Sequence, residues 1–283
     1  MVRVVDGDTP TRKRKSLLDP GEKHLTPLER FQIGFVQRSF EPGPADRTIR
    51  VLQRVIGSTW IDVCSRRVRH IIGRDRLPDL SPQDSVVLVS NHRSFFDLYV
   101  VVGYLVKHGL AQRIMFPVRS KFFYDHPMGM VVNGVMSFFA MYPPVFRERE
   151  RAALNIATLD EVVRLLERGG TVVGLHPEGQ RNKTGDPYAL LPAQSGVGRI
   201  IHGAKVKVVP IFINGLINDM AKQVVGNLRG TADPIVIAFG KPVEFDGMLQ
   251  EPPSPRIFKR ISERCMEEVA KLGEEEKAYR AGL

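Results

Sequence analysis

A histidine and an aspartate stand five residues apart in the segment SNHRSFFDLY, residues 90–99, directly after an apolar run. In a regular helix this spacing would put His92 and Asp97 on different faces. If His92 lies in the turn before the helix, however, the carboxylate can reach one ring nitrogen, fix the tautomer and leave the other nitrogen as a general base. The pair is therefore a candidate for activating a hydroxyl group, although a helix-capping or buried histidine would have the same sequence.

A second polar cluster, PEGQR at residues 177–181, follows the apolar run TVVGLH. It places an acidic residue, Glu178, and a basic residue, Arg181, on either side of Gly179, which is also a common pattern in surface turns. In open α/β sheets the functional groups gather at the carboxyl ends of the strands. We therefore expect this cluster to lie at the same edge of the sheet as His92.

A third cluster, FRERER at residues 146–151, could offer Arg149 to a phosphate group, because a guanidinium binds phosphate oxygens through two parallel hydrogen bonds. A solvated charge run that opens the next helix would have the same composition. Other catalytic patterns are missing from the sequence, which has no GxSxG, no HExxH and no GxGxxG after a strand. Cys64 and Cys265 lie far apart without a CxxC or histidine-rich neighbour, so no metal site is expected.

Short apolar runs alternate with helical patterns after residue 77, and these elements must position the polar clusters. The runs typical of strands are 85–90, 113–118, 171–176, 206–213 and 234–239. The patterns that predict helices are 94–107, 127–140, 151–168, 194–204 and 255–277. The alternation predicts an α/β fold with a mostly parallel central sheet flanked by helices.

The charge of the chain favours anionic partners. Its 41 Lys and Arg against 31 Asp and Glu give a formal charge of +10, which suits nucleic acid, anionic lipid or phosphorylated substrates. The sequence has no RNA-binding aromatic signature and no zinc-finger spacing, so nucleic acid is not an expected partner. Residues 128–146 approach the length of a membrane span, but Asn133, Ser137 and two prolines favour a buried helix followed by a strand.

Three regions follow from these patterns. Residues 1–45 carry charge clusters and scattered prolines and are predicted to form a flexible basic tail and an irregular segment, with no signal peptide. Residues 46–76 alternate apolar residues with arginines at helical spacing, which predicts amphipathic basic helices that either dock on a membrane or cover the core. Residues 77–283 are predicted to form the α/β domain.

Taken in chain order, four segments resemble the motifs of the glycerolipid acyltransferase family, typified by the lysophosphatidate acyltransferases. NHRSFFD (91–97) is similar to NHxxxxD, FRER (146–149) to a motif that ends in arginine, HPEGQR (176–181) to FPEGTR, and VVPIFI (208–213) to a strand containing VP. The resemblance covers roughly residues 80–245. His176 stands where the family has phenylalanine, and Gln180 where it has threonine, two departures that bear on the acceptor.

The resemblance implies a mechanism. His92 would remove a proton from an acceptor hydroxyl, Asp97 would orient His92, and the hydroxyl would attack the thioester of acyl-CoA or an acyl carrier protein directly. It implies catalytic roles for His92, Asp97 and Glu178. It implies substrate-binding roles for Asn91, Arg149, Gly179 and Arg181, with the two arginines holding a phosphate. No metal or cofactor is expected, because the acyl donor is a co-substrate.

We therefore predict a peripheral enzyme on the cytoplasmic face of an anionic membrane that acylates a lysophospholipid, with 1-acylglycerol-3-phosphate as the best match. Glycerol 3-phosphate and a glycolipid are alternative acceptors. A hydrolase that uses the same pair to activate water on a thioester is another alternative. A non-enzymatic protein that binds anionic membranes is a less favoured one.

Overall fold

The computed structural model describes residues 24–283, and the start of the predicted basic tail lies outside them. The strands are β1 Arg69–Ile72, β2 Val86–Ser90, β3 Arg113–Met115, β4 Val118–Arg119, β5 Pro144–Val145, β6 Thr171–Leu175, β7 Lys207–Asn214 and β8 Ile235–Phe239. Within the described residues, six of them form a sheet in the order β1-β8-β7-β2-β6-β3, and β4 pairs with β5. Neighbouring strands run parallel, except that β7 and β8 are antiparallel.

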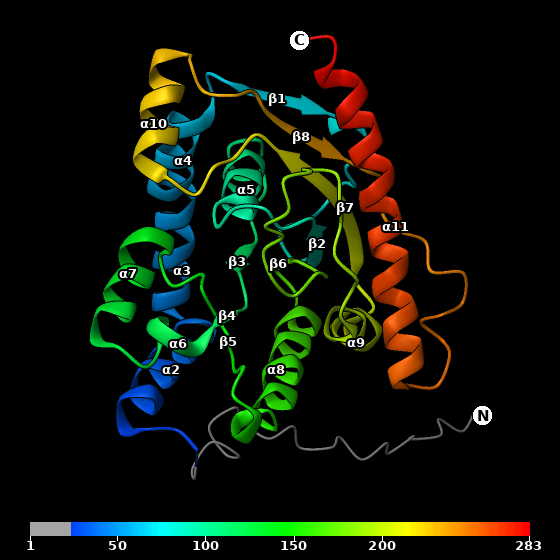
Figure 1. Cartoon of the computed structure of the whole chain (residues 1–283). Coiled ribbons are helices and arrows are strands. Elements are labelled where there is room, and N and C mark those ends of the chain that lie inside the picture. The colour runs from blue at the N-terminus through cyan, green and yellow to red at the C-terminus, as the bar shows by residue number, and fades with distance from the viewer. Residues whose placement is uncertain (1–23) are drawn as a thin grey trace, which may run out of the picture.

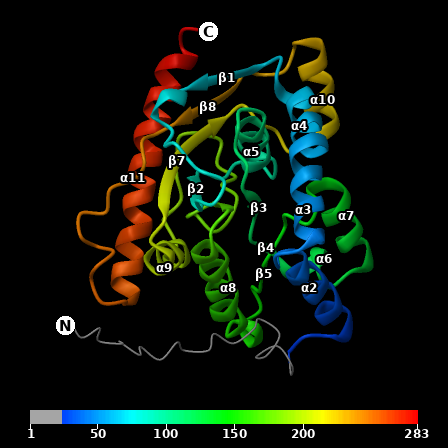
Figure 2. The same ribbon diagram turned by 180° about the vertical axis from the view of Figure 1, so that it is seen from behind.

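Helices lie on both sides of the sheet (Figure 1), as the view from behind also shows (Figure 2). The α-helices are α2 Pro27–Ser39, α3 Pro44–Leu52, α4 Ser58–Ser65, α5 Asp97–Lys107, α6 Ser120–Phe123, α7 Pro127–Ser137, α8 Leu154–Arg168, α9 Ser195–Ala204, α10 Met220–Arg229 and α11 Pro255–Arg280. Three short elements complete the described chain: the π-helix η1 Gln53–Gly57 and the 3-10 helices η2 Arg74–Arg76 and η3 Arg149–Arg151.

Strand β2 shows how the core is divided between the two faces of the sheet. Val86 and Leu88 belong to the apolar core beneath α5, whereas Val87 and Val89 pack with residues of α8, α9 and α11. All residues of the strand are buried. A continuous apolar strand is typical of a parallel sheet that is covered on both faces. The predicted α/β fold, with its mostly parallel central sheet, is confirmed.

The register of β2 and β6 brings the first two polar clusters together. The strands are parallel neighbours in which Val89 pairs with Leu175. Both strands therefore end at the same edge of the sheet, where the chain continues into His92 on one side and into residues 176–181 on the other. This adjacency is the one expected from the positions of the two clusters after apolar strands.

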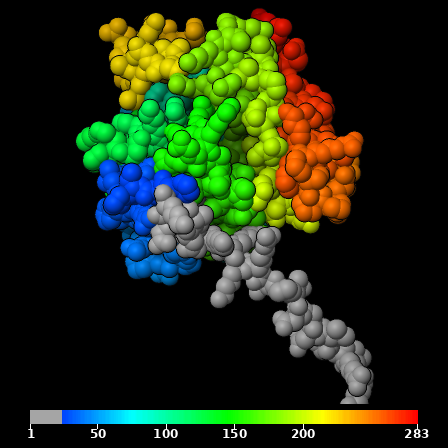
Figure 3. All heavy atoms as spheres, turned by 60° about the horizontal axis from the view of Figure 1, so that its bottom comes forward, coloured from blue at the N-terminus to red at the C-terminus, as the bar shows by residue number. Residues whose placement is uncertain are grey.

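The N-terminal region differs from the prediction in two places. Helix α2 lies in a segment predicted to be irregular, and it begins with a capping box in which Thr26 and Glu29 bind each other's backbone N–H groups. Strand β1 lies where the arginine-rich pattern predicted helix. Its hydrogen-bonding partner is β8, more than 160 residues further along the chain, so local periodicity could not reveal the pairing. In the space-filling view the blue α2 lies against green segments from the middle of the chain (Figure 3).

Helix α7 is followed by β5, in the predicted order, but the helix is not buried as expected. Its residues Met128, Val131 and Val135 are 51%, 52% and 72% exposed. Helix α10 has no counterpart among the predicted elements. Within residues 24–283, none of the helices has both the length and the apolar character needed to span a bilayer.

Candidate active site

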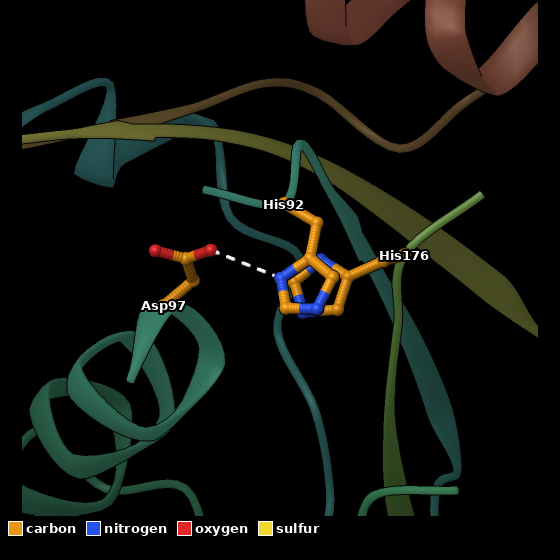
Figure 4. A group of neighbouring side chains, drawn as sticks. All are labelled: His92, Asp97 and His176. Carbon is orange, nitrogen blue, oxygen red and sulfur yellow. Dashed lines mark hydrogen bonds and ion pairs between the residues drawn. The ribbon is translucent and has the colours of Figure 1, made fainter. Parts of the chain in front are cut away.

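His92 and Asp97 meet as the sequence allowed. The chain leaves β2 in a turn that carries His92, and Asp97 begins α5. Asp97 Oδ2 lies 3.2 Å from His92 Nδ1 (Figure 4). The same oxygen accepts hydrogen bonds from the backbone N–H groups of Arg93, at 2.7 Å, and Ser94, at 2.8 Å. A carboxylate can only accept, so His92 Nδ1 carries the proton and Nε2 keeps a free lone pair.

The pKa shifts of this pair keep the His92 ring uncharged at neutral pH. Burial and the positive charge of Arg181 lower the pKa of His92 to about 4. Burial raises the pKa of Asp97 to about 6, against the hydrogen bonds that favour the carboxylate. At neutral pH the imidazole is therefore uncharged and the carboxylate ionised, which is the pairing that a proton-accepting histidine requires.

Glu178 holds the backbone of the site. Its Oε1 accepts from the N–H of His92 at 2.8 Å, and its Oε2 accepts from the N–H of Leu191 at 3.0 Å. The side chain is buried, and burial raises the pKa of its carboxyl group. Both oxygens are thus engaged by main-chain donors, and in this arrangement Glu178 contacts the backbone of His92.

Asn91 and Gly179 both shape the backbone around the site. The buried side chain of Asn91 donates to the carbonyl of Ile213 and accepts from its N–H, both at 2.9 Å, which fixes the end of β2 to β7. Gly179 has a φ of +68°, in the left-handed region that side chains disfavour. An added Cβ there would lie 2.9 Å from Gln194, so the turn that follows β6 needs a glycine for both reasons.

Arg147 and Arg181 make contacts at the site, whereas Arg149, which the sequence suggested together with Arg181, does not. Arg147 donates to the carbonyl of Gly179 at 3.0 Å, and Arg181 donates to Asn218 at 2.8 Å. The positive charges of Arg147 and Arg181 both lower the pKa of His92, so both lie near its ring. Arg149 is exposed at the start of η3, and its side chain forms no hydrogen bond or ion pair with the described residues.

The sequence did not indicate Arg147, because FRER contains two arginines and its composition does not distinguish one from the other. The structure separates them through what surrounds them. Phe146 is buried, and η3 begins two residues after Arg147, so the chain turns between the two guanidinium groups. The apolar residue before Arg147 is the signal that could have indicated which arginine faces the site.

His176, whose role the sequence left open, stacks on the proposed base. The ring centroids of His92 and His176 are 3.7 Å apart and the planes are inclined by 8° (Figure 4). One potential metal-ligand atom from each of these two rings and from Asp97 lies within 4.8 Å of the others, close enough to raise the question of a metal site. Parallel rings, however, direct their nitrogen lone pairs side by side, so the three groups do not converge on one ion as a tetrahedral or octahedral site requires.

The model of the family described as "Acyltransferase" matches residues 68–214, just over half of the chain. The chain belongs to the acyltransferase family. This match spans the His92 and Asp97 pair, both arginines of the site and the PEG turn, and it confirms the family suggested by the four sequence motifs.

Curated relatives of this acyltransferase-family chain have lipid substrates in their names. It is 28% identical over 172 residues to the chloroplastic 1-acyl-sn-glycerol-3-phosphate acyltransferase BAT2 of Brassica napus, over 60% of this chain and 44% of the relative. It is 26% identical over 127 residues to the Homo sapiens 1-acyl-sn-glycerol-3-phosphate acyltransferase beta, over 44% of this chain and 40% of the relative. The chain thus spans less than half the length of these two proteins.

A solved structure has the same fold as this acyltransferase-family chain. The crystal structure of the 1-acyl-sn-glycerophosphate (LPA) acyltransferase PlsC from Thermotoga maritima superposes with a TM-score of 0.53 at 20% identity. The match covers 88% of this chain and 91% of that one. The described helices and sheet therefore share an architecture with an enzyme of known fold.

An apolar pocket that opens to the surface lies beside the acyltransferase motif NHRSFFD and holds about 560 Å³ of space, its open mouth included. It is lined by Phe95, Phe96 and Tyr99 and by residues of α4, α7 and α10, among them Trp60 and Met220. A second cavity of about 350 Å³ shares Ile61, Tyr99 and Met136 with the first. The two pockets share lining residues, and walls of this apolar kind suit a hydrocarbon ligand.

Proposed function

We propose that the protein transfers an acyl chain from acyl-CoA or an acyl carrier protein to the hydroxyl of a lysophospholipid, with 1-acylglycerol-3-phosphate as the preferred acceptor. The observation that carries the proposal is the uncharged His92 held by the buried, ionised Asp97, with a free Nε2 next to two arginines. General bases of this kind typically contribute about 10²–10⁴ to a rate.

The reaction needs one proton to move out and back. His92 Nε2 takes the proton of the acceptor hydroxyl while the hydroxyl oxygen attacks the thioester carbonyl carbon. The positive ring that forms is stabilised by Asp97, 3.2 Å from Nδ1. The tetrahedral intermediate then collapses, the carbon–sulfur bond breaks, and the leaving thiolate takes the proton from Nε2. No acyl-enzyme forms, in keeping with the absence of a nucleophile elbow from the sequence.

The acceptor phosphate is assigned to Arg147 and Arg181. Both guanidinium groups lie close enough to His92 to lower its pKa, so a phosphate bound between them would present a nearby glycerol hydroxyl to Nε2. Guanidinium groups suit the oxygens of a phosphate monoester in geometry as well as in charge. The names of the curated relatives, which are 1-acyl-sn-glycerol-3-phosphate acyltransferases, favour the same acceptor.

Docking on the cytoplasmic face of an anionic membrane completes the proposal. Helices α2, α4, α7 and α10 lie together on one side of the molecule in both ribbon views (Figures 1 and 2). Exposed apolar side chains on this side include Phe31, Val55, Trp60, Val131, Val135 and Leu228. Exposed basic residues, such as Arg54 on η1 and Lys222 on α10, suit anionic headgroups.

The cavity beside Phe95 lies among the same helices, α4, α7 and α10. An acyl chain could therefore pass between the bilayer and the catalytic pair without crossing water. This arrangement would spare the hydrocarbon an exposure that costs about 0.8 kcal/mol for each CH₂ group.

An acceptor screen with labelled acyl-CoA tests the proposed function. Wild-type protein should acylate 1-acylglycerol-3-phosphate in anionic vesicles, and His92→Ala should abolish transfer while folding and vesicle binding persist. Transfer by His92→Ala at the wild-type rate would exclude the proposed base. Release of free fatty acid in place of the acylated product, with acceptor present, would favour the thioester hydrolase.

A further inference from the structure

We infer that His176 is a positioning residue for the proposed base: by stacking face to face, its ring holds the His92 imidazole in line with Asp97. The inference rests on the proposed function, because it concerns the same proton transfer. It goes beyond that function in giving a task to a residue that departs from the phenylalanine of the family motif.

The His92 ring needs such support. Its side chain is 19% exposed, and its only hydrogen bond with the described residues is the 3.2 Å contact to Asp97. The torsion that rotates an imidazole about its Cβ–Cγ bond has broad minima, so one long hydrogen bond leaves the plane of the ring loosely defined. The ring of His176, 3.7 Å away and nearly parallel, blocks rotation out of that plane.

His176 is itself fixed by the strand that leads to His92. Its Nδ1 lies 3.0 Å from the carbonyl oxygen of Asn91, 3.2 Å from that of Ser90 and 3.1 Å from Ser90 Oγ. Carbonyl oxygens only accept, so Nδ1 of His176 carries a proton and donates it to the end of β2. One strand end therefore orients both rings: it leads directly into His92 and it accepts from His176.

The stack also suits the charge that appears during the reaction. When His92 takes a proton, it faces an uncharged ring, because burial and the proximity of His92 lower the pKa of His176 to about 3. Among the described residues, the charged groups around the two rings and their acidic partners are Arg93, Arg147, Arg181, Asp97 and Glu178. Asp97 is thus the anionic group that contacts the protonated His92 ring, and His176 adds no repulsion.

Two substitutions at His176 test the inference. His176→Phe keeps an aromatic face of similar size, and His176→Ala removes it. We expect His176→Ala to lower kcat by about 10- to 100-fold, as loss of alignment at a reacting centre does, while KM for both substrates changes little. His176→Phe should retain kcat within about 3-fold of wild type, since the stack survives. His202→Ala is a matched control, because His202 also contacts an aromatic ring, that of Phe258, in another part of the fold.

A spectroscopic readout makes the test independent of turnover. Nitrogen-15 NMR of His92 should show the Nδ1–H tautomer in wild type, in His176→Phe and in the His202→Ala control. In His176→Ala, water replaces the ring, so the tautomers should mix and the pKa of His92 should rise toward its ordinary value. Thermal melts of all variants establish that they are folded.

The inference is overturned if folded His176→Ala keeps the wild-type kcat and the wild-type tautomer of His92. It is also overturned if His176→Phe is as impaired as His176→Ala, because a nitrogen atom of His176 would then act and the stack would not suffice. If the wild-type protein shows no acyl transfer, the proposed function is contradicted. The NMR comparison still tests whether His176 orients the His92 ring in that case.

Discussion

The main-chain N–H of His92 donates to Glu178 Oε1 at 2.8 Å, while Glu178 Oε2 accepts from Leu191 at 3.0 Å. One buried carboxylate thus joins the turn that carries the proposed base to a loop almost a hundred residues further along the chain. Because both oxygens are engaged, Glu178 is better suited to holding the position of His92 than to exchanging protons with a substrate.

Glu178→Gln should weaken both the fold and the reaction. Glutamine has one acceptor oxygen, so its amide nitrogen would face one of the two backbone N–H groups and leave that group unsatisfied. We expect a loss of about 1–3 kcal/mol in the free energy of unfolding, measured by urea denaturation, together with a lower kcat. Glu274→Gln, at an exposed position on α11, is the control. Wild-type stability and kcat in Glu178→Gln would contradict the positioning role.

The pH profile of kcat/KM should show an acid limb below neutrality. The proposed mechanism requires uncharged His92 and ionised Asp97, whose pKa values are shifted to about 4 and about 6. Activity should therefore be level at neutral pH and fall as the pair takes up protons between about pH 6 and about pH 4, as a coupled titration. A limb centred above pH 6.5, the ordinary pKa of histidine, would show that His92 is not desolvated in this way.

Arg181→Gln should move the part of this limb that belongs to His92 to higher pH. The positive charge of Arg181 lowers the pKa of His92, so removing the charge raises that pKa and the proton is taken up earlier on acidification. Nuclear magnetic resonance titration of the His92 ring measures the shift directly. An unchanged pKa in a folded Arg181→Gln variant would mean that the guanidinium is too distant or too well screened to act on the base.

Arg147 and Arg149 should differ in their effect on the acceptor. Both arginines are exposed, but Arg147 donates to the carbonyl of Gly179, whereas the side chain of Arg149 forms no hydrogen bond with the described residues. Arg147→Gln should raise KM for a phosphate-bearing acceptor by about 10-fold or more, the effect of losing one charged hydrogen bond. Arg149→Gln should change it by less than about 3-fold. The opposite order would restore Arg149 as the phosphate ligand.

Val135→Asp should weaken vesicle binding without altering the site. Val135 is 72% exposed on α7, where a carboxylate would face the proposed bilayer and repel anionic headgroups. Ile156→Asp, at a 53% exposed position on α8, is the matched control on another part of the surface. Cosedimentation with anionic vesicles should fall for Val135→Asp alone. Equal losses of vesicle binding in both variants would show that the added negative charge weakens binding wherever it lies, and would contradict docking through the α7 face.

Five of the six strands of the sheet could be predicted, because each is a short apolar run that needs no distant information. VVLVS, TVVGL and IVIAF are buried along their whole length, and the sequence alone places them within a residue or two. Strand β1 could not be found in this way. Its residues are only partly buried, and it is a strand because it pairs with the distant strand β8. The exposure of one face of α7 could not be predicted either, because an apolar helix has the same sequence pattern whether it packs on a core or on a bilayer.

The sequence by itself determined the proposed base and its partner: His92 in a turn and Asp97 at the first residue of a helix are a local arrangement, set by five residues. Tertiary structure alone decided which groups complete the site. Arg147 rather than Arg149 lies beside Gly179, and His176 stacks on His92. These relationships join residues on different strands, and they depend on the register of β2 with β6 and on where the chain turns after β5, which no local pattern records.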